Sequence, residues 1–397
     1  MDRCYGIIAE FNPFHNGHAA LCARARQDGA THIAAVMSGS FVQRGSPAVT
    51  DKYVRTRAAL LSGCDLVVEL PLPYAMATAS QFAAGAVALL RAMGCVDSLC
   101  FGTESAALPD LQTAAEAVEH PDLRTALQPY LSAGMTFAGA RQLAVAELCG
   151  AQIAACLTQP NHILAVEYLR QLHKQGWSPD LLAIPRVGAA HDSADPDIAA
   201  GIASASYLRR HPQELGAYVP AQALAVYSEA AEKGLFPACP EKLENAILAH
   251  LRRLTPEQLR LLPDVSEGIS DRLYKAIAHS TTLPQLEAAV KTKRYPLARV
   301  RRLIYSAFLG ITARDWQQPP PYIHVLGFNA RGAQLLTRMK NAALPVHTGL
   351  AYLEKQNAAC RRLAALEATA TDMYSLTLPC PPPRGYAYSA SAVFLKD

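Results

Sequence analysis

Short apolar runs alternate with helix-length segments through the first hundred residues of this 397-residue chain. The pattern predicts strands over 5–10, 32–37, 65–70 and 96–101, separated by helices over 17–27, 51–61 and 80–93. Near-continuous apolar strands joined by helices of this length are typical of a parallel sheet that is covered on both faces. We therefore expect an α/β fold with a Rossmann-like parallel sheet in this part of the chain.

The remainder of the chain has a more helical pattern. Residues 108–174 and the Leu-rich segments 242–262 and 284–310 read as helices, with a further strand over 181–185. An αβ-like stretch near 322–340 follows a proline-rich loop, and the proline-rich tail reads as irregular. We expect a catalytic domain over 1–211 and a mostly helical region over 212–397.

Composition narrows the class of protein. The hydrophobic fraction of 51% and the charged fraction of 18% are typical of a globular chain. The apolar runs are too interrupted to span a bilayer, and the N-terminus does not resemble a signal peptide. We therefore expect a cytoplasmic protein that does not associate with a membrane. Ten cysteines without a C-x-x-C pair indicate reduced thiols, and we predict no protein metal site. A net charge of +4 is too small to establish a nucleic-acid partner.

The polar motifs fall in loops that follow the predicted strands, at 12–18, 38–45 and 102–104. In open parallel sheets, ligands bind outside the carboxyl ends of the strands. The sequence therefore predicts a ligand site at this edge of the sheet.

The motif His15-Asn16-Gly17-His18 carries the most specific chemistry. It follows a strand and opens a helix, so backbone N–H groups at the helix N-terminus are available to a phosphate. Gly17 would let a nucleotide approach the backbone, and two imidazoles could stabilise charge that develops at a phosphorus atom. We predict a nucleotide site with His15 and His18 as its catalytic residues. The alternative is that both are ordinary capping or core histidines.

A wider set of motifs resembles one family. Residues 6–18 are similar to the start of bacterial tRNA(Met) cytidine acetate ligases, whose (H/T)-x-G-H motif is shared with other adenylyl-transferring enzymes related to class I aminoacyl-tRNA synthetases. The similarity continues through segments spread over nearly the whole chain: 37–45, 65–71, 101–104, 159–168, 202–209, 292–295 and 325–329. This chain departs from the family in having Ser40 where Asn is usual and Leu208 where Ile is common.

The resemblance implies a nucleotidyltransferase-like domain and a two-step reaction. ATP and acetate would form acetyl-adenylate and pyrophosphate, and the acetyl group would pass to N4 of the wobble cytidine of elongator tRNA(Met). Mg²⁺ is expected with ATP on chemical grounds, and no obligate protein partner is inferred. The ATP contacts implied by the family motifs are Ile8, Ala9, Glu10, Phe11, Asn12, Pro13, Phe14, His15, Asn16, Gly17, His18, Ala19, Ala20, Leu21, Gly102, Asn161 and Arg186.

A second phosphate clamp is expected from the segment 204–209, with Ser204 and Arg209 closing over the nucleotide. The alternative is a plain helix start, in which Ser204 is an N-cap and Arg209 is solvated. Asn161 also has two interpretations, because a residue that follows Pro160 could merely cap the next helix.

Six basic residues lie within the twelve residues 291–302, which contain no acid. At helical spacing, an apolar face forms and leaves Arg299 and Arg302 elsewhere; its residues are Leu297, Val300, Leu303, Ile304 and Phe308. A solvated face would explain such a run. Since Tyr295 is interleaved and the family acts on RNA, we predict tRNA phosphate contacts for Lys291, Lys293, Arg294, Arg299 and Arg302.

Two other functions remain open from the sequence. One is an H-x-G-H enzyme that adenylylates a small phosphate ester or a mononucleotide. The other is a tRNA-binding protein whose nucleotide pocket has lost catalysis. Substrate-dependent pyrophosphate exchange separates the enzymes from the binding protein.

Overall fold

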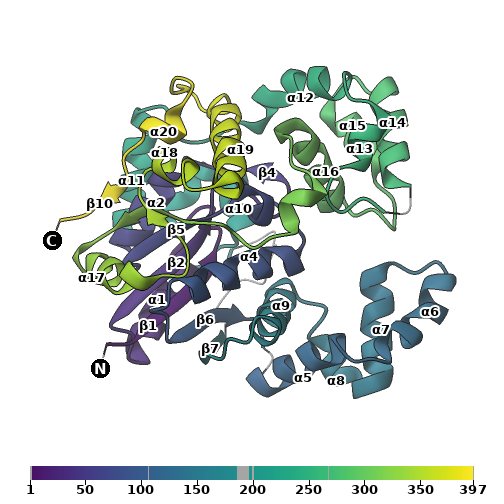
Figure 1. The fold of residues 1–397 in the computed structure, drawn as a ribbon, viewed down its shortest axis with the longest axis horizontal. Helices are drawn as coiled ribbons and strands as arrows, with labels where there is room; N and C mark the ends of the chain where they lie inside the picture. Colours follow the sequence, from purple (N-terminus) through teal and green to yellow (C-terminus); the bar gives the residue numbers. More distant parts are fainter. Residues whose placement is uncertain (1, 106, 186–195, 199–200, 267, 397) are drawn as a thin grey trace.

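A mostly parallel sheet forms the centre of the molecule (Figure 1). The structure is a computed structural model and describes residues 2–105, 107–185, 196–198, 201–266 and 268–396. Its order is β10-β8-β5-β2-β1-β6-β7, where β8 is Ile323–Phe328 and β10 is Val393–Phe394; β9 (Val346–His347) also pairs with β8. The parallel strands are β1 (Cys4–Ala9), β2 (His32–Ser38), β5 (Leu66–Leu70), β6 (Ser98–Thr103) and β7 (Asp180–Pro185). The predicted α/β class and its parallel sheet are confirmed.

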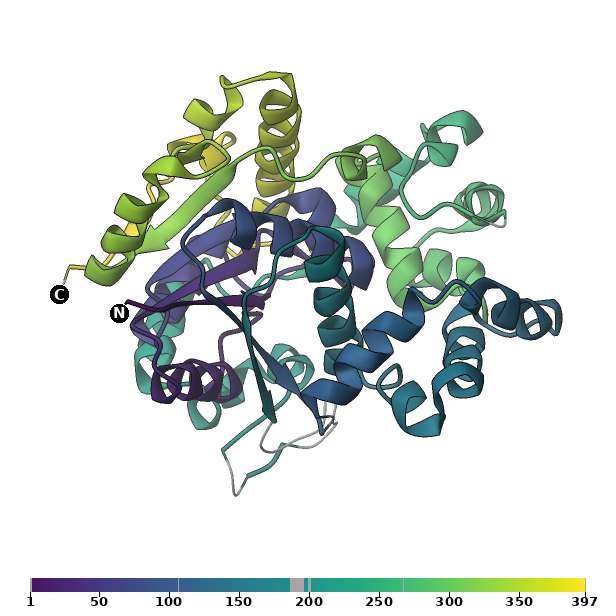
Figure 2. The same ribbon diagram turned by 60° about the horizontal axis from the view of Figure 1, so that its bottom comes forward.

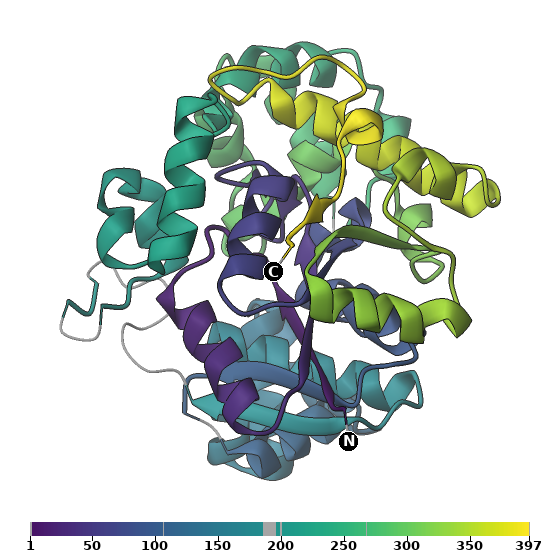
Figure 3. The same cartoon turned by 90° about the vertical axis from the view of Figure 1, so that its left-hand side faces the viewer.

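Alternate residues of the central strands supply two separate cores. In β2, Ala34 and Val36 pack toward one face of the sheet, whereas Ile33, Ala35 and Met37 pack toward the other. Because both faces are buried, the strands lack the polar positions of a half-exposed sheet. Figure 3 shows α1 and α17 (Ala330–Arg338) on either side of the strands.

The predicted helices between the strands are present with small shifts at their ends. They are α1 (Asn16–Gln27), α2 (Lys52–Leu61) and α4 (Ala79–Ala92), with the short α3 (Leu72–Ala75) before α4. Polar N-caps begin two of them, since Asp51 accepts from the Tyr53 amide and Thr78 accepts from the Gln81 amide. A two-stranded hairpin, β3 (Phe41–Val42) and β4 (Ser46–Pro47), follows β2.

Two groups of helices extend from the sheet on the side away from both termini (Figures 1 and 2). One contains α5 (Leu108–Val118), α6 (Leu123–Ser132), α7 (Phe137–Cys149) and α8 (Ala151–Ala155), followed by α9 (Pro160–Lys174). The other contains α12 (Glu244–Leu251), α13 (Pro256–Arg260), α14 (Ile269–His279), α15 (Leu283–Val290) and α16 (Leu297–Leu309). Among the described residues, none of the helices is both long and apolar enough to cross a membrane.

The C-terminal part of the chain completes the main sheet. The segment expected as a small αβ unit forms β8 (Ile323–Phe328) and α17, and β8 pairs antiparallel with β5. The tail, which the prolines predicted to be irregular, adds β10 (Val393–Phe394) beside β8 after α18 (Leu350–Glu354), α19 (Ala358–Ser375) and α20 (Tyr386–Ser389). Helix α11 (Ala221–Glu232) packs on α2 in the core of the first part. Elements from both predicted regions, on either side of residue 211, therefore build one sheet and its cover.

Buried charges join β8 and α19 to the sheet. Lys52 Nζ lies 2.7 Å from Glu69 Oε1, and His324 Nδ1 lies 2.6 Å from Glu69 Oε2. Burial opposes ionisation of Glu69, but the charge of Lys52 and the hydrogen bond from His324 lower its pKa to about 2. Burial, together with the charge on Glu69, raises the pKa of Glu367 well above its usual range. One carboxylate of this cluster is therefore ionised beside Lys52, while Glu367 keeps its proton.

Candidate active site

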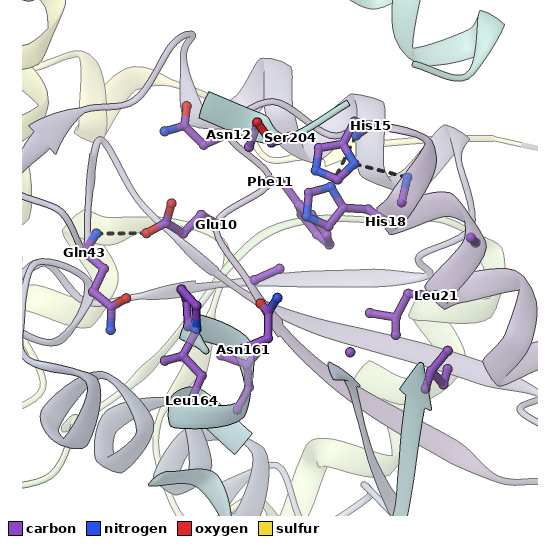
Figure 4. Close-up of a pocket in the computed structure, with 18 of the residues that line it drawn as sticks. Glu10, Phe11, Asn12, His15, His18, Leu21, Gln43, Asn161, Leu164 and Ser204 are labelled. Carbon is purple, nitrogen blue, oxygen red and sulfur yellow. Dashed lines mark hydrogen bonds between the residues drawn. The ribbon is translucent and has the colours of Figure 1, made fainter. Parts of the chain in front are cut away.

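A cavity of about 890 Å³ lies at the carboxyl edge of β1, β6 and β7 (Figure 4). Phe11, with a φ of 46°, turns the chain away from the end of β1 and into the H-x-G-H loop. The predicted residues that line this cavity are Ile8, Ala9, Glu10, Phe11, Asn12, His15, Gly17, His18, Ala20, Leu21, Gly102, Asn161, Ser204 and Arg209. The fold therefore brings together segments that are up to two hundred residues apart in the chain.

Four predicted nucleotide contacts do not line the cavity: Pro13, Phe14, Asn16 and Ala19. The Phe14 ring is fully buried, and its amide donates to Tyr227 Oη at 2.8 Å. The Asn16 side chain donates to the Gly201 carbonyl oxygen at 2.8 Å. Phe14 and Asn16 therefore fix the H-x-G-H loop through contacts outside the cavity. Arg186 lies outside the described residues, so its predicted contact stays a prediction.

His15 and His18 form a stacked pair at the N-terminus of α1. Their ring centroids are 3.8 Å apart with an interplanar angle of 30°. His15 Nδ1 accepts a hydrogen bond from the Gly17 amide at 3.1 Å, and His18 Nδ1 accepts one from the His15 amide at 3.2 Å. A Cβ on Gly17 would lie 2.9 Å from His15 Cε1, so the stack requires glycine there.

The capping and catalytic interpretations of these histidines are compatible. Both Nδ1 atoms serve the helix cap, so each neutral ring carries its proton on Nε2. Figure 4 shows both rings at the cavity, between Glu10 on one side and Leu21 on the other. The cap therefore fixes the orientation of both rings at the cavity wall, where a bound nucleotide would meet them.

Ser204 and Arg209 connect the second motif to the first. Ser204 Oγ accepts from the Tyr207 amide at 3.1 Å and caps α10 (Ala205–Arg210), as the plain interpretation of this serine predicted. Arg209 Nη1 donates to the Asn12 carbonyl oxygen at 2.8 Å, and Nη2 donates to Ser206 Oγ at 3.1 Å. Arg209 is thus held at the cavity by the H-x-G-H loop and is not a solvated surface group.

Glu104 positions Asn161 at the start of α9, a role that we did not predict. Glu104 Oε1 accepts from the Asn161 amide at 3.0 Å and from its Nδ2 at 2.7 Å. His162 Nε2 accepts from the amides of Glu104 and Ser105, both at 3.0 Å. The pairing leaves the Asn161 Oδ1 acceptor for a ligand at the cavity wall.

Arg55 is a buried residue that sequence reasoning missed. It lies on α2 and donates to the carbonyl oxygens of Glu10 at 2.8 Å and Ser38 at 2.9 Å, and also to that of Gly39. Burial lowers its pKa, although nearby acidic groups oppose this. Arg55 thus ties together the ends of β1 and β2, the two strands that carry the site loops. The only sequence signal was a charged residue in a helix that must cover the sheet.

The basic run 291–302 divides into two kinds of residue. The apolar face of α16 is confirmed for Val300, Leu303, Ile304 and Phe308, which are buried, whereas Leu297 in the first turn is only partly buried. Lys291, Lys293 and Arg294 precede the helix and are exposed. Arg299 and Arg302 contact Asp264 at 3.3 Å and 3.5 Å, and their side chains are only 16% exposed.

The run also lies against the site loop. Arg302 Nη1 lies 3.5 Å from the Gln43 carbonyl oxygen. Gly45, with a φ of 72°, packs so closely on α16 that a Cβ there would lie 2.5 Å from the Arg302 nitrogen. Ser40, which departs from the family pattern, is buried and pairs with Thr371 of α19 at 3.3 Å. The loop after β2 is therefore fixed between the cavity and the basic run.

The parallel sheet and the H-x-G-H cavity at its carboxyl edge define a nucleotidyl transferase, and a family model described as HIGH Nucleotidyl Transferase matches residues 2–385. Curated relatives give a narrower identity. A tRNA(Met) cytidine acetate ligase of Thermoanaerobacter sp. (strain X514) is 38% identical over 383 residues, which cover 94% of each chain. One of Syntrophomonas wolfei is 37% identical over 401 residues, which cover 96% of each chain. The chain belongs to the tRNA(Met) cytidine acetate ligase family.

Solved structures agree with this assignment over the full length. Thermotoga maritima TmcAL in an apo crystal form is 29% identical, with a TM-score of 0.93 and complete coverage of both chains. The same protein bound with alpha-thio ATP is 28% identical, with a TM-score of 0.91. The resemblance inferred from the motifs is confirmed.

Proposed function

We propose that this protein activates acetate with ATP and transfers the acetyl group to N4 of the wobble cytidine of elongator tRNA(Met). The observation that carries the proposal is the stacked pair His15 and His18, with both Nδ1 atoms taken by the cap of α1 at the cavity. The names of the family members supply the acceptor and the acyl donor.

In the first step, the acetate carboxylate attacks the α-phosphorus of ATP, and pyrophosphate leaves. Negative charge grows on the phosphoryl oxygens, where N–H donors stabilise it most. The Nε2–H groups of His15 and His18, the N-terminus of α1 and the Arg209 guanidinium are the donors that we assign to this charge. The product is acetyl-adenylate, a mixed anhydride with AMP as a good leaving group.

The ATP base would occupy the end of the cavity between α1 and β7. Leu21 of α1, Gly102 of β6 and Ile184 of β7 all line the cavity. The structure of T. maritima TmcAL bound with alpha-thio ATP supports nucleotide binding in this fold. Asn161 and Arg186 remain proposed contacts to the nucleotide.

Mg²⁺ would enter with the phosphates of ATP. The described residues contain no group of three or more His, Cys, Asp or Glu side chains arranged as metal ligands. Mg²⁺ commonly keeps several waters and binds through substrate phosphates. The ion would neutralise phosphate charge, and the residues named above would orient the nucleotide.

The test of the proposal separates the two steps. Exchange of labelled pyrophosphate into ATP should depend on acetate, and mass analysis should find labelled acetate on cytidine in tRNA(Met). Exchange that depends on another small acid or phosphate ester would instead favour a different H-x-G-H adenylyltransferase. Binding of tRNA without any exchange would favour the inactive binding protein.

A further inference from the structure

The cavity continues beyond the H-x-G-H loop on the side opposite Leu21. Figure 4 shows Glu10, Gln43 and Leu164 at this end. Phe82 of α4 and Tyr168 of α9 also line the cavity. Apolar side chains thus provide walls for a planar ring, and polar groups from β1 and the loop after β2 stand at its edge. We call this part of the cavity the acceptor end, defined by Glu10, Gln43, Phe82, Leu164 and Tyr168.

Glu10 is held so that one carboxylate oxygen can serve a ligand. Its Oε1 accepts from the Gln43 amide at 3.0 Å, and its carbonyl oxygen accepts from buried Arg55 at 2.8 Å. Its Oε2 accepts no hydrogen bond from the residues that the structure describes. Burial raises the pKa of the Tyr168 phenol, and the negative charge of Glu10 raises it further, so the carboxylate and the phenol lie near each other.

Gln43 contributes a second unsatisfied group. Its Nε2 is buried and has no hydrogen-bond partner in the described part of the chain. A buried amide donor without a partner is costly, and a ligand oxygen or ring nitrogen would satisfy it. The acceptor end therefore combines a carboxylate acceptor with an amide donor between apolar walls.

The basic run lies against the loop after β2 at the same end of the cavity. The backbone of Gln43 contacts Arg302, and Gly45 packs on α16, so exposed Lys291, Lys293 and Arg294 lie at the start of a helix that touches this loop. Gln43 thus contacts the basic run through its backbone and lines the cavity with its side chain.

On the basis of the proposed function, we propose that the acceptor end receives the cytosine to be acetylated, and that Glu10 accepts a hydrogen from its N4 amino group. Cytosine offers N4–H donors where uracil offers an oxygen acceptor, so a carboxylate favours cytosine and repels uracil. A base turned out of a loop and held between apolar side chains is a common form of RNA recognition.

The same contact gives the second step its base. The N4 lone pair attacks the acetyl carbonyl carbon, and the bond between that carbon and the phosphate oxygen breaks. AMP leaves with the electron pair, and the N4 proton passes to the Glu10 carboxylate. An amide bond forms, and the atoms balance without another reactant.

The experiment measures transfer from preformed acetyl-adenylate to tRNA(Met) in a single turnover, beside acetate-dependent pyrophosphate exchange. In Glu10→Gln, the amide oxygen still accepts from the Gln43 amide, so the loop contact is kept while the base is removed. Because Glu10 is also among the expected ATP contacts, exchange can fall too, and the proposal is judged on the ratio: we expect transfer to fall by about 10²–10⁴ and by at least about tenfold more than exchange. Glu10→Asp should recover part of the transfer rate, and Glu232→Gln, at an exposed residue at the end of α11, is the matched control.

A binding measurement tests recognition separately from chemistry. Anticodon stem–loop RNAs with cytidine or uridine at the wobble position are compared as competitors. The unchanged protein should prefer the cytidine RNA by about tenfold, and Glu10→Gln should lose this preference. Unchanged transfer in a folded Glu10→Gln protein would overturn the proposal, as would equal losses of transfer and exchange. Failure of the unchanged protein to show acetate-dependent exchange would instead overturn the proposed function.

Discussion

Asp264 Oδ2 lies 3.5 Å from Arg302 Nη2 and 3.3 Å from Arg299 Nε. Both arginines are therefore paired with a carboxylate and are not freely solvated. Burial lowers the pKa of Arg302, and the nearby Asp264 carboxylate opposes this shift. Removal of either arginine would leave the partly buried Asp264 carboxylate with one cation in place of two, which is costly. The two arginines therefore support the structure of the basic run, and the lysines and Arg294 form its accessible part.

We predict that replacing Lys291, Lys293 and Arg294 together with Ala weakens tRNA binding and flattens its salt dependence. Each lost phosphate contact should reduce the slope of log affinity against log salt by about 0.7–0.9 units. Acetate-dependent exchange without tRNA should persist. The matched control removes three exposed cations elsewhere, Lys340, Lys355 and Arg361. Wild-type affinity and slope in the first variant would show that the run is only a solvated surface.

We predict that Arg302→Ala acts first on stability. The variant should lower the unfolding midpoint in urea and weaken tRNA binding only as far as its folded fraction falls. A variant with unchanged stability and a selective loss of tRNA affinity would assign Arg302 to phosphate binding instead.

We predict that His18→Asn and His18→Ala both lower acetate-dependent pyrophosphate exchange by about 10²–10³, because both remove the Nε2–H donor. Asn can place its Oδ1 where Nδ1 accepts from the His15 amide, so it should keep the cap of α1. Ala should lose about 0.5–2 kcal/mol of stability with the cap. Thermal unfolding and exchange assays on both variants check this. Exchange that survives in His18→Asn would assign the ring to the cap alone.

We predict that Glu367→Gln stabilises the protein at neutral pH. Its raised pKa means that the folded chain holds a proton that the unfolded chain releases above about pH 4.5, so the stability it provides is lost as pH rises. Gln mimics the protonated acid and avoids this loss. Its advantage over Glu should grow as pH rises above 4.5.

Glu69 should behave in the opposite way. Its lowered pKa provides stability above the ordinary value of 4.5, and this stability is lost as pH falls toward about 2. Urea unfolding of Glu367→Gln and of the unchanged protein from pH 4 to pH 8 checks the sign for Glu367. Unfolding of the unchanged protein from pH 5 down to pH 2 checks the sign for Glu69. A Glu367→Gln variant that is less stable throughout the range from pH 4 to pH 8 would contradict the assigned protonation of the cluster.

We predict that a fragment of residues 1–211 does not fold independently. It would lack β8, leaving the apolar edge of β5 unpaired, and it would lack α11 over α2. Near-ultraviolet circular dichroism and dye binding should show a loosely packed or aggregating chain. A cooperative unfolding transition in the fragment would support the boundary near residue 211.

Local pattern was sufficient for the parallel strands, their helices and the H-x-G-H loop. The strand and helix predictions depend on apolar spacing over a few residues, and the spacing places His15 and His18 at a helix start without reference to distant contacts. The apolar face of α16 could likewise be predicted from the sequence, because the spacing of its apolar residues follows the repeat of the helix.

The sequence by itself determined the α/β class, the family and the position of the nucleotide motif, because these reside in short ordered segments. Tertiary structure alone decided that β8 runs antiparallel beside β5, that Arg302 faces Asp264, and that Glu10 meets Gln43 at the acceptor end. Each of these contacts joins residues far apart in the chain, and a single side chain reads the same in sequence whether its partner is water or a buried charge. The packed sheet fixes which loops share its carboxyl edge, and it thereby decides whether such a side chain meets water or a buried partner.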